Sequence, residues 1–319
     1  MNGFTLEFER PIVELESKIE ELKGLPASKA INLDSEIKKL EEKLESARQE
    51  IYQNLTPWQR VQLARHPKRP YTLDYVEKIM DDFIELHGDR LFSDDKALIG
   101  GLATLEGTRV MLVGHQKGKD TNENLMRNFG SAHPEGYRKA IRLMQMADKF
   151  RLPVLCFVDT PGAYPGVGAE ERGQAQAIAL NLREMARITV PIVVVVIGEG
   201  GSGGALGIGV GDRILVLENA YYSVISPEGC AAILWKDRAK APEAAACLKL
   251  TAKDLLRLKL IDELVKEPMG GAHRDPDTAA TTLKAALKKH LKELKALSKK
   301  QLLTGRQEKF RKMGVFTEV

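Results

Sequence analysis

Apolar residues follow a helical spacing near the start of the chain. From Ile12 to Leu22, and again from Leu33 to Ile51, they recur three and four positions apart, and charged residues fill the positions between them. This spacing places apolar side chains on one face of a helix. The two runs are separated by KGLPASKAIN, whose glycine and proline interrupt helices. We therefore expect a helical hairpin over residues 1–56 that packs on the rest of the chain or on another chain.

From about residue 97 the pattern becomes that of strands. ALIGGLATLEG and TRVMLVGHQ flank Glu106-Gly107, which predicts a β-hairpin. LPVLCFVD and VPIVVVVI are apolar without interruption, as in strands covered on both faces. Each leads into a glycine-rich loop and a helix, and RILVLENAYYSVISPEGC adds two short strands. The repeat predicts an α/β protein with its site at the carboxyl ends of the strands.

Helical spacing returns between and after the strands. It predicts helices over roughly 72–87 and 169–187 and one that begins near Pro134. After the short strands we expect helices to the end, including a long basic one that Asp275 caps and Pro276 begins. This divides the chain into the hairpin (1–56), a core domain (57–296) and a basic helical tail (297–319).

Composition narrows the class of protein. The chain has 319 residues, of which 43% are hydrophobic and 29% charged, as in ordinary globular proteins. No apolar run reaches the length of a membrane span, and the acidic start lacks the apolar core of an export signal, so we expect a cytoplasmic protein. The three cysteines form no CxxC pair and the six histidines form no HxxxH or HExxH pair. We therefore expect neither a disulfide framework nor a metal site.

Charge is distributed unevenly. Residues 1–55 carry 12 acidic and eight basic side chains, whereas residues 272–319 carry five acidic and 12 basic ones. A solvated basic helix explains the second segment, and a patch for nucleic acid or an acidic partner is the alternative. Few aromatic residues lie among these charges, which weakens the case for single-stranded nucleic acid.

The stretch GEGGSGGALGIGVGD, residues 198–212, fits three motifs. Gly198, Gly200 and Gly203 match the dinucleotide fingerprint GxGxxG, with Glu218 twenty residues after the first glycine. The glycines at 207, 209 and 211 disfavour the long helix that this motif needs. VDTPG, residues 158–162, resembles a GTPase loop, but no GxxxxGK[ST] phosphate loop accompanies it.

A nucleophile elbow, GxSxG, is the second interpretation. It would use Ser202, with His273 downstream as the base, but no HGGG-type segment supplies oxyanion donors. The third interpretation uses the backbone alone. A glycine loop that enters a helix presents unpaired N–H groups that can stabilise a developing oxyanion. Close packing of helix on strand is the structural alternative for these glycines.

Several longer motifs carry a family resemblance. RPYTLDYV, GHQKG, PEGYRKAIRLMQMAD, DTPGAYPGVGAEERGQ, GEGGSGGALGIGVGD and YYSVISPEGCAAILWK resemble the carboxyltransferase alpha subunits of bacterial acetyl-CoA carboxylase. The resemblance covers nearly the whole chain. The family's PLGGAHR stands here as PMGGAHR, with Met269 in place of leucine.

The resemblance implies a crotonase/ClpP-like fold of repeated ββα units. It implies transfer of a carboxyl group from carboxybiotin on the biotin carboxyl carrier protein to acetyl-CoA, which gives malonyl-CoA for fatty acid biosynthesis. It also implies a carboxyltransferase beta subunit in an assembly of two alpha and two beta chains, with a biotin carboxylase and with zinc on the beta subunit only. A hydratase or decarboxylase acting on another acyl-CoA is the alternative enzyme, and an interaction protein the alternative outside enzymes.

The resemblance also assigns residues. Backbone N–H groups of Gly203, Gly204 and Ala205 would form an oxyanion hole. The substrate-binding residues would be Gly162, Ala163, Gly200, Gly201, Lys117, Tyr137 and Arg138, with packing or surface roles as the alternative for the last three. Glu199 could serve as a general base, although a structural role is expected.

Overall fold

The computed structural model describes residues 4–24 and 33–314. Its centre is an eight-stranded sheet in the order β1-β2-β3-β4-β5-β6-β8, and β7 pairs with the far end of β5. β1, β2 and β3 are antiparallel, and the pairs from β3 to β8 are parallel. The strands are β1 (Asp81–Glu85), β2 (Leu98–Leu105), β3 (Thr108–His115), β4 (Val154–Thr160), β5 (Ile192–Gly201), β6 (Arg213–Leu217), β7 (Tyr221–Ser223) and β8 (Glu263–Val265).

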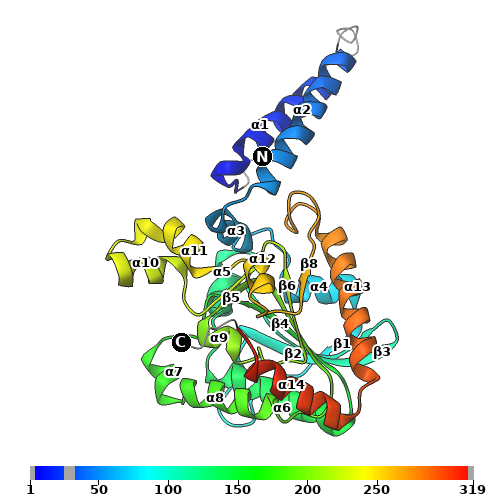
Figure 1. Ribbon diagram of the computed structural model, residues 1–319, viewed down its shortest axis with the longest axis vertical. Coiled ribbons are helices and arrows are strands. Elements are labelled where there is room, and N and C mark those ends of the chain that lie inside the picture. The colour runs from blue at the N-terminus through cyan, green and yellow to red at the C-terminus, as the bar shows by residue number, and fades with distance from the viewer. Residues whose placement is uncertain (1–3, 25–32, 315–319) are drawn as a thin grey trace.

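Helices precede, cover and follow the sheet (Figure 1). They are α1 (Arg10–Lys23), α2 (Leu33–Gln53), α3 (Pro57–Ala64), α4 (Thr72–Ile79), α5 (Thr121–Met126), α6 (Pro134–Phe150), α7 (Val167–Glu171), α8 (Gln174–Met185), α9 (Ser202–Leu206), α10 (Pro227–Trp235), α11 (Ala241–Leu248), α12 (Ala252–Arg257), α13 (Pro276–Lys295) and α14 (Lys299–Arg311). Short 3-10 turns lie at Glu7–Glu9, Asn128–Gly130 and Arg238–Lys240. None of these described helices has the length and apolar character that crossing a membrane requires.

The predicted helical hairpin is confirmed. α1 and α2 pack on each other and project from the body of the molecule (Figure 1). Ile12, Ile19 and Leu44 lie in their shared apolar cluster. Most of the predicted break between the two helices, residues 25–32, falls outside the described residues. The boundaries that we drew between domains remain predictions.

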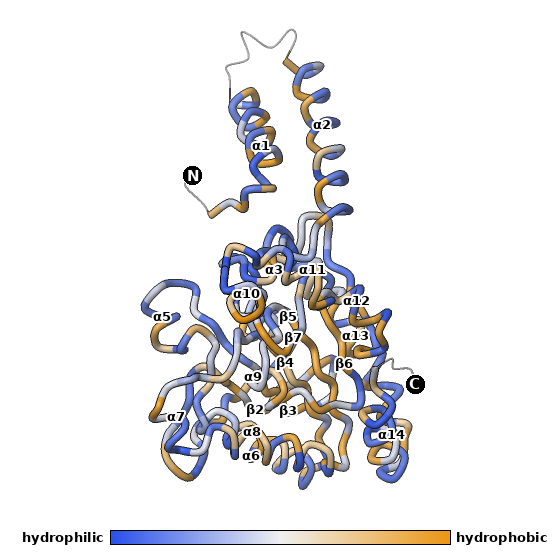
Figure 2. Tube along the Cα trace, turned by 60° about the vertical axis from the view of Figure 1, so that its left-hand side comes forward, coloured by the Kyte–Doolittle hydropathy of each residue, from blue (hydrophilic) through white to orange (hydrophobic). Residues whose placement is uncertain are grey.

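The two faces of the sheet are covered by different helices. Gly100 of β2 faces Leu143 of α6, whereas Gly114 of β3 faces Thr72 of α4. These glycines point to opposite faces, because Gly100 pairs with Val113, the neighbour of Gly114. α8 packs on α6, and α13 packs on α4. Both faces are thus covered, which explains why β4 and β5 are buried along their whole length and mainly apolar (Figure 2).

Several expected elements are confirmed at their predicted positions. The β2–β3 hairpin turns at Glu106 and Gly107, whose φ angles of 48° and 72° fit a type I′ turn. α6 begins at Pro134, and the side chain of Asp275 caps α13 by accepting the N–H of Thr278. The short strands β6 and β7 are also present.

Other boundaries were wrong. The helix predicted over 72–87 ends at Ile79, because residues 81–85 pair with β2 as an edge strand. The helix predicted over 169–187 is divided into α7 and α8 by Gly173, at a φ of 82°. The helices expected after β7 are interrupted by β8, which pairs with β6. In each of the two missed strands, pairing across the sheet outweighed a short and ambiguous local pattern.

Candidate functional site

Two glycine-containing segments meet where β4 and β5 end. Thr160 of β4 pairs with Gly200 of β5, so the parallel strands end at one edge of the sheet. A Cβ atom on Gly201 would lie 2.2 Å from the carbonyl oxygen of Pro161, and one on Gly204 would lie 2.6 Å from the amide nitrogen of Ala163. Both distances are far below van der Waals contact. Glycine at these two positions is what lets the loop after β4 lie against the turn after β5.

The expected glycine loop is shorter than its sequence implies. Gly198 to Gly201 belong to β5, because residues 199–201 pair with β7. The turn occurs at Ser202, whose φ of 50° lies in the left-handed region, and α9 starts there. The first N–H groups of a helix have no partner within it. The backbone donors of Gly203, Gly204 and Ala205 therefore stand at the start of α9, beside Gly162 and Ala163.

Lys117 belongs to a buried group of charges near the ends of the strands that lead to this site. Its Nζ donates to Oδ1 of Asp159 at 2.7 Å and to Oε1 of Glu199 at 2.9 Å. The N–H of Glu199 donates to the same Oδ1 of Asp159 at 2.9 Å. We call Lys117, Asp159 and Glu199 the Lys117 cluster. Its ammonium donates to two carboxylates, and these contacts give substrate binding by Lys117 no geometric support, so that role stays a prediction.

Glu199 has the contacts of an ionised, structural carboxylate. Its Oε2 accepts from Nε of Arg65 and from the Tyr221 hydroxyl, each at 2.7 Å. Burial opposes its charge, but Lys117 and Arg65 outweigh burial and lower the pKa of Glu199 to about 2. A carboxylate with so low a pKa is a poor proton acceptor at neutral pH. The geometry supports the expected structural role and not general-base catalysis.

Tyr137 and Arg138 are held by packing and by ion pairs. Tyr137 is fully buried, and a Cβ on Gly207 would meet its ring at 2.5 Å. Arg138 donates to Asp89 at 2.8 Å and to the carbonyl of Arg172 at 3.0 Å. Their packing and ion-pair contacts give substrate binding no geometric support, and that role stays a prediction.

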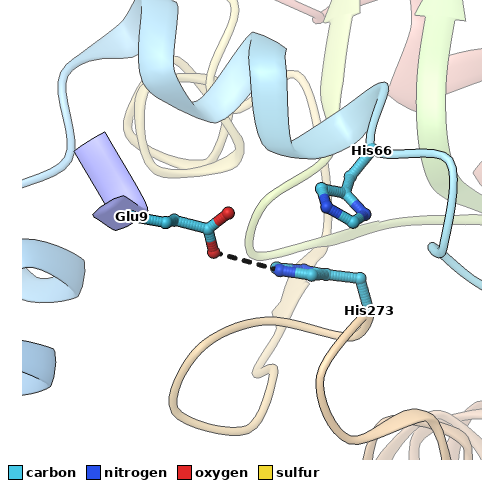
Figure 3. A group of neighbouring side chains, drawn as sticks. All are labelled: Glu9, His66 and His273. Carbon is cyan, nitrogen blue, oxygen red and sulfur yellow. Dashed lines mark hydrogen bonds and ion pairs between the residues drawn. The ribbon is translucent and has the colours of Figure 1, made fainter. Parts of the chain in front are cut away.

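The structure meets one requirement of a nucleophile elbow, the turn at the serine, but not the other, a nearby base. Ser202 does sit at a strained strand-to-helix turn, as a nucleophile elbow requires. His273, however, is held elsewhere. Its Nε2 lies 3.1 Å from Oε1 of Glu9, and its ring lies against the ring of His66 at a tilt of 34°, with centroids 4.1 Å apart (Figure 3). The structure therefore does not bring the expected base to the serine.

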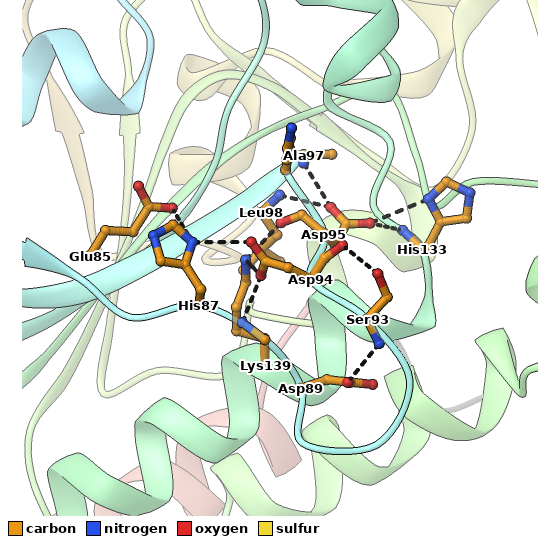
Figure 4. Close-up of polar contacts among 12 residues, drawn as sticks. Glu85, His87, Asp89, Ser93, Asp94, Asp95, Ala97, Leu98, His133 and Lys139 are labelled. Carbon is orange, nitrogen blue, oxygen red and sulfur yellow. Dashed lines mark hydrogen bonds and ion pairs between the residues drawn. The ribbon is translucent and has the colours of Figure 1, made fainter.

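Among the described residues, two groups of side chains could each hold a metal ion, although we expected no metal site. The first is Glu9, His66 and His273, and the second is Asp95, His133 and Glu135. The carboxylates in both already accept hydrogen bonds. Glu9 accepts from the Tyr52 hydroxyl and lies beside His273, and Asp95 accepts the N–H groups of Ala97, Leu98 and His133 (Figure 4). Because these contacts already occupy the carboxylates, we interpret both groups as structural.

Sequence reasoning missed Asp159 and Arg65. Asp159 carried a usable signal, because a charged residue at the end of the apolar run LCFVD needs a buried partner. Arg65 follows α3 and contacts a residue 134 positions away, and nothing local marks it.

Solved structures share the fold of this chain. A transcarboxylase 12S structure is similar with a TM-score of 0.56 and 22% identity, over 70% of this chain and 42% of that chain. The beta subunit of P. aeruginosa geranyl-CoA carboxylase is similar with a TM-score of 0.55 and 18% identity, over 83% and 48%. The expected crotonase-like α/β fold, with its parallel sheet, is thus confirmed as that of the carboxyltransferases.

The sequence then defines the family. The chain belongs to the acetyl co-enzyme A carboxylase carboxyltransferase-like family, whose model matches residues 5–314. The acetyl-coenzyme A carboxylase carboxyl transferase subunit alpha of Geobacter metallireducens is 62% identical over 315 residues, 99% of each chain. A subunit of the same name from Thermus thermophilus is 62% identical over 313 residues, 98% of this chain and 99% of that one. The resemblance drawn from the motifs is confirmed.

Proposed function

We propose that this chain is the alpha half of a carboxyltransferase that moves a carboxyl group from carboxybiotin to acetyl-CoA and forms malonyl-CoA. The observation that carries the proposal is identity of 62% along 99% of the chain to a relative with that subunit name. The backbone site at the ends of β4 and β5 supports it, because the reaction needs charge stabilisation and positioning rather than a protein nucleophile.

The N–H groups of Gly203, Gly204 and Ala205 serve as an oxyanion hole in this proposal. They stand at the start of α9, where they are aligned before the reaction begins. A negative oxygen that develops on the substrate accepts hydrogen bonds from them. One such donor is worth roughly 10²–10³ in rate. Gly162, Ala163, Gly200 and Gly201 shape the adjoining pocket, since the two segments touch there.

The partners follow from the same proposal. A carboxyltransferase beta subunit completes the site in an assembly of two alpha and two beta chains, and it carries the zinc. The biotin carboxyl carrier protein delivers the carboxybiotin that a biotin carboxylase makes. We place this assembly in the cytoplasm, where it supplies malonyl-CoA for fatty acid biosynthesis.

The test is malonyl-CoA-dependent carboxylation of biocytin, measured with this chain alone and with a co-expressed beta-type subunit. We expect turnover only in the mixture, because the site is shared between the two chains. A correctly assembled complex without activity would contradict the proposal. Hydration of an unsaturated acyl-CoA by this chain alone would favour the alternative enzyme, although Glu199 is already paired with Lys117 and Arg65.

A further inference from the structure

The Lys117 cluster lies where three strands of the sheet end. Lys117 follows β3 by two residues, Asp159 is in β4 and Glu199 is in β5. The ammonium contacts both carboxylates within 3 Å, and its side chain is only 10% exposed. Asp159 lies three residues before Gly162, and Glu199 lies four before Gly203. One buried cation thus joins the starting points of both segments of the proposed site.

Residues 199–201 of β5 pair with β7 on one side, but the pairing with β4 on the other side is irregular here. Val158 pairs with Val196 and Thr160 pairs with Gly200, so two steps along β4 match four steps along β5. Such an irregularity interrupts the ladder of backbone hydrogen bonds and redirects the strand. Here the Asp159 carboxylate takes the place of a ladder partner by accepting the N–H of Glu199. A Cβ on Gly198 would lie 2.5 Å from that carboxylate, so the side chain lies directly against the irregular segment.

The charges make this arrangement depend on Lys117. Asp159 and Glu199 are both buried, at 1% and 6% exposure. Glu199 has a second cation in Arg65, whereas among the residues that the structure describes, Asp159 has an ion pair with Lys117 alone. Removing the ammonium would leave two neighbouring carboxylates, of which only Glu199 would keep a cationic partner, Arg65. Buried like charges repel strongly, so the pair would separate or take up a proton.

We propose that Lys117 is a positioning residue, which holds the irregular end of β5 against β4 and so sets the direction of the N–H groups at the start of α9. Lys117 acts through Asp159 and Glu199 and does not touch substrate. The inference rests on the proposed function for its effect on turnover, and on the geometry alone for its effect on the backbone.

The main variant is Lys117→Met, assayed in the complex with the beta-type subunit. We expect kcat to fall about 100-fold, because a displacement of about 1 Å in a positioned group costs that much. KM for malonyl-CoA stays within about threefold, because in this proposal Lys117 orients the donors of the oxyanion hole and does not touch the substrate. Asp159→Asn keeps an oxygen that can accept the Glu199 N–H, so we expect a smaller fall in kcat. Asp159→Leu lacks that oxygen, and we expect kcat to fall as much as in Lys117→Met. The double variant K117M/D159L is no worse than either single one, because both remove the same link.

Hydrogen exchange tests the backbone effect without any activity. Exchange in Lys117→Met accelerates in peptides that cover residues 196–206 and stays unchanged in β2. Arg306→Met is the matched control, because it also breaks a buried ion pair, 2.7 Å from Asp212, on another part of the molecule. It lowers the melting temperature but leaves both exchange at 196–206 and kcat per assembled complex unchanged.

The outcomes separate the two proposals. Unchanged exchange at 196–206 in Lys117→Met and Asp159→Leu overturns the positioning role whether or not the wild-type complex is active. A kcat equal to that of the wild type in both variants also overturns the positioning role. An inactive wild-type complex whose variants still show the local acceleration contradicts the proposed function alone. If Lys117→Met does not assemble, the graded comparison of Asp159→Asn with Asp159→Leu replaces it.

Discussion

At the scale of the residue, neighbouring positions in one turn have opposite requirements. Gly204 must lack a side chain, because the backbone of residues 162–163 occupies the space where a Cβ would be. Ser202 carries a side chain although its φ of 50° is unusual for one. A backbone site predicts that changing the first removes activity and that changing the hydroxyl of the second does not.

Gly204→Val should abolish turnover in the biocytin assay. Its Cβ would lie 2.6 Å from the Ala163 amide nitrogen, so the two segments must separate and the N–H groups lose their direction. We expect a loss of at least about 10²–10³-fold, the value of one such donor. Gly305→Ala in α14 is the control, since its Cβ meets nothing within 4 Å. Wild-type turnover in Gly204→Val would be incompatible with the backbone site.

Ser202→Ala should keep most of the turnover. The proposed chemistry uses the backbone at this position, and alanine retains the N–H. The assay is the same one, with circular dichroism to establish folding. A thousandfold loss in a folded variant would instead identify the serine hydroxyl as a nucleophile.

At the scale of the element, α14 is part of the body rather than a free basic tail. Leu302 belongs to the main apolar cluster. Arg306 is 2% exposed; it pairs with Asp212 at 2.7 Å and donates to three carbonyl oxygens, of Met185, Ile188 and Val190. The helix was predictable from its pattern, but the buried arginine was not, because its partners lie about a hundred residues away.

Arg306→Met should destabilise the fold by about 3–5 kcal/mol, because it leaves the buried Asp212 carboxylate without its cation. The free energy of unfolding in urea gives the value. Arg311→Met, at an exposed position of the same helix, is the matched control and should change stability by less than about 0.5 kcal/mol. Equal effects of the two variants would show that the Arg306 pair does not hold α14.

At the scale of the whole molecule, the hairpin joins the body through buried polar side chains. Glu9 at the hairpin's base lies beside His273 of the body (Figure 3). It also accepts from Tyr52 of α2 and meets Arg274 of the body. The ring of His66 lies against that of His273 in the same place. Burial, with a smaller effect of His273, lowers the pKa of His66 to about 4, against the opposing attraction of Glu9.

This junction makes stability depend on pH. The unfolded chain takes up a proton on His66 near pH 6.5, but the folded chain does so only near its pKa of about 4. Well above pH 6.5, His66 therefore does not lower the free energy of unfolding. That free energy falls as the pH drops through 6.5 toward 4. Between pH 7.5 and 5 the expected loss is about 2 kcal/mol. Lys68, Arg274 and His273 also disfavour the proton, and Glu9 favours it.

Burial also lowers the pKa of His115 to about 3, so thermal melts at the two pH values are compared between the wild type and His66→Gln to isolate the loss due to His66. His66→Gln should reduce the difference, since glutamine does not titrate. The pKa of Glu9 is lowered to about 2, so this carboxylate's contribution is lost only below about pH 4.5 and does not interfere. An equal pH dependence in wild type and His66→Gln would assign it to other groups.

Longer motifs resemble one family, and the sequence by itself also determined the hairpin, the β2–β3 turn, the buried strands β4 and β5 and the two glycine segments. These follow from local spacing and from the backbone chemistry of glycine and proline, which neighbours along the chain dictate. Tertiary structure decided that β1 and β8 are strands, that Tyr137 packs on Gly207, and that Lys117 pairs with Asp159 and Glu199. Those outcomes depend on which strand ends meet in space, and a buried charge chooses its partner by distance in the fold rather than by separation in the sequence.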